Sequence, residues 1–108
     1  MSPFDPYSFF CAVNIAFAHF AARRFEQAIE WADRALHEQP RLVSQTRVKV
    51  VAYAHLGRLD EARAQLSRVL AMDPKLTIDG FRGYRHFMAP EVLELYIAGL
   101  RLAGLPEK

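Results

Sequence analysis

The sequence predicts an all-α domain made of short helices that run antiparallel to their neighbours. Three observations support this fold class: apolar residues recur with helical spacing, prolines and glycines separate the helical segments, and no segment shows sustained strand-type alternation. The connections are short, which favours antiparallel neighbours. The 108 residues are 52% hydrophobic and 24% charged, as is typical of one globular domain with a small core.

The first part of the chain contains two predicted helices. Asp5 and Pro6 form a typical N-cap followed by a proline in the first turn, so the first helix is expected to run from there to about Ala22. The second helix is expected over residues 25–38, where the apolar side chains share one face, and Pro40 ends it.

Two further helices are predicted, and a glycine or a proline ends each of them. The third is predicted over residues 42–56 and ends at Gly57, which suits the left-handed position after a helix. The fourth is predicted over residues 59–72 and is closed by Pro74. Arg23 stands where Gly57 stands in the later turn, so the earlier turn is expected to be built differently or under strain.

The remainder of the chain is predicted to cap these helices. A short helix is expected near residues 77–85. Pro90 then opens a longer helix, which Gly104 and Pro106 end. The apolar face of this last helix is wide, which suits a helix lying across the end of a stack.

The chain repeats itself with a period of 34 residues. Pro40 and Pro74 show this offset. The same offset relates Ala28 to Ala62, Arg34 to Arg68 and Leu36 to Leu70. A helix pair with this period, an alanine at the closest helix contact and a closing proline resembles the tetratricopeptide repeat (TPR) family. The resemblance implies an α-solenoid of two TPR hairpins plus capping helices in one domain: unit one at about 7–40, unit two at about 41–74 and a capping tail at 75–108.

A narrower resemblance covers almost the whole chain. The stretches "RRFEQAIEWADRAL", "AHLGRLDEARAQLSRVLAMDP" and "LYIAGLRLAGLPEK" are similar to the C-terminal TPR segments of bacterial class III adenylate/guanylate cyclases and related winged-helix regulators. The resemblance implies a non-catalytic, regulatory protein–protein interaction segment of a larger signalling protein, such as a nucleotide cyclase or a transcriptional regulator. It does not place a cyclase active site in this chain.

The first helices of successive TPR units line a concave groove, so the resemblance also implies where a partner binds. The predicted groove residues are Phe10, Val13, Phe17, Ser44, Arg47, Val51 and His55. The residues with which some TPR domains clamp a peptide's terminal carboxylate are not evident, so we expect a hydrophobic or helical segment as the ligand. Phe10 and Phe17 suit equally well a contact with an element upstream of the first helix.

Self-association is the alternative function. The first helix is apolar almost all round, and one neighbour cannot cover such a surface, so a second copy of the chain is a candidate partner. A third hypothesis is an enzyme or nucleotide-binding regulator in its own right, which binding of ATP or a cyclic nucleotide would support.

No catalytic residue, cofactor or metal site is predicted. The four histidines lack metal-ligand spacing, and Cys11 is expected to be a buried, inert thiol. The "GFRGYR" stretch at 80–85 lacks the lysine and hydroxyl residue of a phosphate loop. The basic and aromatic residues at 81–87 could bind an acidic peptide or nucleic acid, but we favour inward aromatic rings and solvated arginines.

The net charge and the single cysteine restrict which partners and which cellular compartment we expect. A net charge of +2 is too small to indicate a nucleic-acid or membrane-surface protein. One cysteine excludes an internal disulfide and indicates a reducing cytoplasm. We see no signal peptide, and the apolar run at 9–22 is shorter than the roughly 20 residues that span a bilayer.

Overall fold

The computed structural model describes residues 6–83 and 88–108, with side chains from Cys11 onward. Every regular element in this part of the chain is a helix, so the predicted all-α class is confirmed. In chain order the helices are α1 (Pro6–Ala21), α2 (Phe25–Glu38), α3 (Val43–His55), α4 (Leu59–Met72), α5 (Ile78–Arg82) and α6 (Pro90–Ala103).

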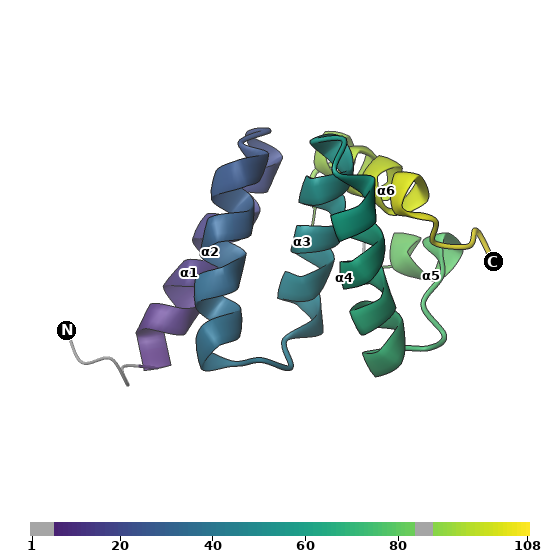
Figure 1. Cartoon of the computed structure of the whole chain (residues 1–108). Coiled ribbons are helices and arrows are strands. Elements are labelled where there is room, and N and C mark those ends of the chain that lie inside the picture. Colours follow the sequence, from purple (N-terminus) through teal and green to yellow (C-terminus); the bar gives the residue numbers. More distant parts are fainter. Residues whose placement is uncertain (1–5, 84–87) are drawn as a thin grey trace.

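The first four helices form two antiparallel hairpins that stand side by side. Helix α1 packs on α2, α3 packs on α4, and α2 joins the hairpins by packing on α3 (Figure 1). Helices α2 and α4 have the predicted bounds, because each combines one apolar face with a proline stop. Helix α5 ends earlier than predicted, at Arg82, and the last two residues of its predicted range lie outside the described residues.

Small residues allow the helices of each hairpin to approach closely. Ala28 on α2 and Ala62 on α4, the repeat-related alanines, are both completely buried. Their short side chains leave room for the facing helix at interior packing density. Leu36 and Leu70, eight residues after these alanines, are half-buried.

The turns within the two hairpins have the same backbone geometry. Arg23 has φ +63° and Gly57 has φ +79°. In each turn the following N–H group donates five residues back: Arg24 N to His19 O at 2.8 Å, and Arg58 N to Tyr53 O at 2.9 Å. This pattern is a Schellman motif, which normally places glycine in the left-handed position. The expected strain is therefore present at Arg23, since the first hairpin makes the glycine turn without glycine.

Helix α6 packs on α3 and α4 as the predicted cap, and its contact with α3 is unusually close. A Cβ atom built on Gly99 would lie 2.7 Å from Val51 Cβ and 2.9 Å from Val51 Cα. Only a residue without a side chain allows the two backbones to come this near. Gly99 therefore sets how tightly α6 is pressed against α3.

The end of the chain holds α5 in place. The first turn of α5 donates backbone hydrogen bonds to the tail, from Ile78 N to Pro106 O and from Asp79 N to Glu107 O, both at 2.9 Å. Thr77 Oγ1 accepts from Gly80 N at 3.0 Å and completes the cap. These bonds satisfy N–H groups that a helix start leaves free.

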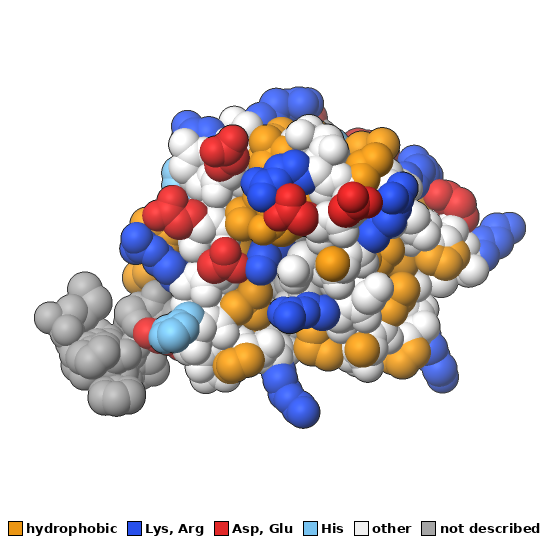
Figure 2. All heavy atoms as spheres, viewed as in Figure 1, with side chains coloured by type: hydrophobic (Ala, Val, Ile, Leu, Met, Phe, Trp, Pro, Cys, Tyr) orange, Lys and Arg blue, Asp and Glu red, His pale blue; other side chains and the backbone are white. Residues whose placement is uncertain are grey.

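The second helix of each hairpin, α2 or α4, carries both acidic and basic side chains. Figure 2 shows acidic and basic side chains interspersed over the upper part of the face that carries α2 and α4. Lys49 on α3 pairs with Asp33 on α2 at 2.7 Å, which links the two hairpins. Such mixed charge gives no single-sign patch on this face.

Candidate functional site

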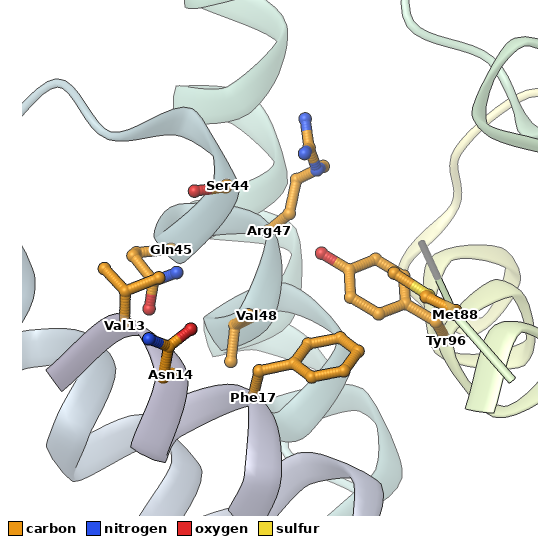
Figure 3. A pocket seen from close by; sticks show the side chains of 9 residues that line it. All are labelled: Val13, Asn14, Phe17, Ser44, Gln45, Arg47, Val48, Met88 and Tyr96. Carbon is orange, nitrogen blue, oxygen red and sulfur yellow. The ribbon is translucent and has the colours of Figure 1, made fainter. Parts of the chain in front are cut away.

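A cavity of about 420 Å³ opens between the two hairpins and the C-terminal part of the chain. Helix α1 supplies one wall, α3 the centre, and α6 together with Met88 the opposite wall (Figure 3). Its lining residues are Val13, Asn14, Phe17, Ser44, Gln45, Arg47, Val48, Met88 and Tyr96. The volume falls in the range of about 300–1,000 Å³ that is usual for ligand pockets.

The cavity is apolar over most of its surface. Phe17 and Val48 lie next to each other in the lower middle of Figure 3, and Met88 lies beside Tyr96 at the right. Tyr96 is held by two rings: Phe81 stacks on it with centroids 4.7 Å apart, and Phe20 meets it edge-on at 5.3 Å. These contacts fix the tyrosine, so that wall of the cavity is preformed.

One polar group in the wall lacks a hydrogen-bond partner among the described residues. Gln45 is only 2% exposed, and its Oε1 has no hydrogen-bond partner within the described part of the chain. Native proteins pair most buried polar atoms, because an unpaired buried acceptor loses its hydration without compensation. Gln45 therefore places an acceptor without a donor, among the described residues, in the wall of the cavity.

Arg47 is the second polar group without a full set of partners. Its Nε is buried and makes no hydrogen bond to a described residue. Its guanidinium carbon lies 5.5 Å from the centre of the Phe81 ring. None of the ion pairs among the described residues includes Arg47. The cavity thus carries a cation that no carboxylate of this part of the chain neutralises.

The hydroxyl of Tyr96 stays neutral beside this cation. Burial raises the pKa of Tyr96 above its ordinary value of 10.0, and the neighbouring Arg47 guanidinium opposes the rise only in part. Tyr96 and Arg47 together therefore present a positive, hydrogen-bonding end of the cavity.

Four of the seven predicted groove residues line this cavity: Val13, Phe17, Ser44 and Arg47. Val51 does not, because it is completely buried beneath Gly99 of α6. His55 is also taken up in a structural contact, since its Nε2 donates to the backbone carbonyl of Leu95 at 2.6 Å. Helix α6 thus closes the half of the groove that these two residues were predicted to form. The side chain of Phe10 lies outside the described residues.

Five lining residues were missed by the sequence analysis: Asn14, Gln45, Val48, Met88 and Tyr96. Met88 and Tyr96 come from the tail, which was treated as a cap alone. The signal that could have found Tyr96 is its place one turn before Gly99, on the side of the last helix that packs on α3. Gln45 had a weaker signal, as an uncharged polar residue between two predicted groove positions.

The other candidate residues are placed as follows. Cys11 is exposed, so the prediction of a buried thiol was wrong; this side of α1 is left uncovered by the other described helices. Phe81 is buried, and Arg82 forms an ion pair with Glu94 at 2.7 Å. The rest of the basic and aromatic cluster, at 84–87, lies outside the described residues.

Neither a metal site nor a membrane span is found among the residues that the structure describes. No group of three or more His, Cys, Asp or Glu side chains in this part could hold a metal ion. No described helix has the length and apolar character required to cross a bilayer.

Comparison of the chain with protein-family models, with curated proteins and with solved structures finds no match.

Proposed function

We propose that the chain is a non-catalytic interaction module that binds a segment of another protein in the cavity between α1, α3 and α6. The observation that carries this proposal is the cavity itself: an apolar, preformed site in which, among the described residues, a buried acceptor on Gln45 has no donor and a cation on Arg47 has no carboxylate partner. A concave apolar surface with a few polar groups is the usual form of a binding site.

The size of the cavity favours a local contact over the docking of a long helix. Helix α6 covers Val51 and engages His55, so the continuous groove expected from the repeat is reduced to one cavity. A single side chain with its neighbouring backbone suits this space better than a row of anchors.

We also propose that the two hairpins are tetratricopeptide-like units and that the module belongs to a larger bacterial signalling protein, such as a nucleotide cyclase or a transcriptional regulator. The support is the repeat of 34 residues between Pro40 and Pro74, together with the identical turns at Arg23 and Gly57. The reading frame before Met1 tests the wider context, because a catalytic or DNA-binding domain should be encoded there.

Selection from a random peptide library displayed on phage tests the binding function. Ser44→Trp places a large ring in the cavity without removing any core side chain, since Ser44 is a small residue in its wall. Ser67→Trp makes the same change at an exposed site on α4.

Peptides selected on the wild-type protein should bind the Ser44→Trp variant at least about tenfold more weakly and should bind the Ser67→Trp variant equally well. Peptides that bind both variants as tightly as the wild type would show that the cavity is not the site. A selection that yields no binding peptide would count against the function itself.

Self-association remains the second candidate function. The uncovered side of α1 carries the exposed residues Cys11 and Ala18, with Ile15 half-buried between them. Light scattering over a range of concentrations tests it, with Ala18→Arg as the disrupting variant. A monomer at the highest concentration would exclude a homodimer through α1.

A further inference from the structure

The two ends of the cavity differ in chemistry, and this difference restricts the ligand. In Figure 3 the amide groups of Asn14 and Gln45 lie at one end, and the guanidinium of Arg47 lies at the other, near the hydroxyl of Tyr96. Phe17 and Val48 form the apolar part between them. A ligand that uses the whole cavity must therefore be apolar in its middle and polar at two separate points.

The Arg47 end requires an acceptor with negative charge. Among the described residues the buried Nε has no hydrogen-bond partner, and none of the ion pairs includes the guanidinium. A guanidinium presents its N–H groups as a planar fork that matches a carboxylate, and a charged acceptor bonds it more strongly than a neutral one. The guanidinium carbon lies 5.5 Å from the centre of the Phe81 ring, and the N–H groups at the edge of the guanidinium are the donors for such a partner.

The Gln45 end requires a donor. Its Oε1 is a buried acceptor without a hydrogen-bond partner among the described residues, and the residue is only 2% exposed, so a donor must reach into the cavity wall to pair with it. A second carboxylate cannot serve, because it has no hydrogen to donate. A backbone N–H group serves well when the peptide is extended. Most N–H groups of a helical ligand are already bonded within the helix.

We infer that the cavity takes an extended peptide segment in which an apolar side chain is followed by Asp or Glu. The apolar side chain packs on Phe17 and Val48, the carboxylate is bound by Arg47, and a peptide N–H donates to Gln45 Oε1. This inference rests on the proposed function and gives the chemical class of the partner. It narrows the hydrophobic or helical segment expected from the sequence to an extended one.

Blocked tetrapeptides test the inference, because acetylated and amidated ends remove terminal charge. The three probes are acetyl-Ala-Leu-Asp-Ala-amide, its Leu-Asn counterpart and its Ala-Asp counterpart, titrated into the full chain and followed by amide NMR shifts of the cavity residues. The Leu-Asp peptide should bind about tenfold or more tightly than either of the other two.

Two variants connect this preference to the residues named. Arg47→Gln should abolish the preference for Asp over Asn. The preference is the ratio of the affinities for the Leu-Asp and Leu-Asn peptides, so a small loss of folded protein does not change it. Gln45→Met keeps the shape of the side chain and removes the acceptor. In the wild type, N-methylation of the bonded peptide nitrogen should weaken binding, whereas in the Gln45→Met variant the same methylation should have no further effect.

The outcomes separate the inference from the function on which it rests. Equal affinity of the wild type for the Leu-Asp and Leu-Asn peptides, or an unchanged preference in the Arg47→Gln variant, would overturn the inference. Phage-selected peptides blocked by Ser44→Trp would still support the function in that case. If the tetrapeptides leave the cavity resonances unchanged and the selection also fails, both are overturned.

Discussion

The close contact between α6 and α3 predicts an unusual response to the substitution Gly99→Ala. Inside an exposed helix, alanine is preferred to glycine by about 1 kcal/mol, so this change would ordinarily stabilise the protein. Here the new Cβ would lie 2.9 Å from Val51 Cα, well inside the usual carbon–carbon contact distance of about 3.5–4.0 Å. Because Cα is a backbone atom, a change of side-chain rotamer cannot relieve the overlap, and α6 must move outward.

The magnitude follows from two opposing effects. Overpacking of a well-packed core costs about 1–3 kcal/mol, and a backbone contact places this site in the upper part of that range. Subtracting the helix preference of about 1 kcal/mol leaves a net loss of about 1–2 kcal/mol in the free energy of unfolding. For a domain of this size the midpoint of thermal unfolding should fall by roughly 4–8 °C.

Chemical denaturation of the Gly99→Ala protein measures this loss, and the neighbouring residue supplies the control. Ala98 is exposed on the same helix, so Ala98→Gly should lose about 1 kcal/mol from helix preference alone. Alanine should thus be favoured over glycine at position 98 and disfavoured at position 99. If Gly99→Ala instead stabilises the protein by about 1 kcal/mol, the close approach of the two helices is refuted.

Three further predictions concern the turns of the two hairpins and the surface. Both turn positions have positive φ, so Arg23→Gly should raise the free energy of unfolding by about 1 kcal/mol and Gly57→Ala should lower it by a similar amount. Chemical denaturation in which both variants change this free energy in the same direction would contradict the prediction. The hydrogen bond from Arg82 holds the pKa of Glu94 below its ordinary value of 4.5. The pair therefore stabilises the fold at neutral pH, and this contribution is lost as acid protonates the Glu94 carboxylate. In the Arg82→Gln variant, NMR titration of the carboxyl group should show a higher pKa for Glu94 than in the wild type. Cys11 should react with a thiol reagent in the native protein about as fast as in denaturant, and strong protection would place it in an interface.

The sequence predicts the hairpins well because their signals are local. A helix with one apolar face and a proline stop is specified within its own residues, as α2 and α4 show. The Schellman turn at Gly57 is equally local. The same geometry at Arg23 could be anticipated only through the repeat, because arginine gives no local sign of positive φ.

The site was less predictable because it depends on where α6 lies. The apolar face of that helix predicts a capping role, but it does not predict that Gly99 packs directly on Val51. This packing removes Val51 and His55 from the groove and brings Tyr96 to the cavity. A contact between residues far apart in the chain is decided by shape at interior packing density, which composition and periodicity do not contain.

The C-terminal residues of the chain hold a very short helix in place, and that helix supports one wall of the cavity. Helix α5 has five residues, whereas isolated helices below about 12 residues are marginal in water. Its first turn is held by the carbonyl groups of Pro106 and Glu107, so its order depends on the chain end staying in place. Phe81, which stacks on Tyr96, is carried on α5. Displacing the last residues would therefore release Phe81 and loosen one wall of a cavity that they do not themselves line.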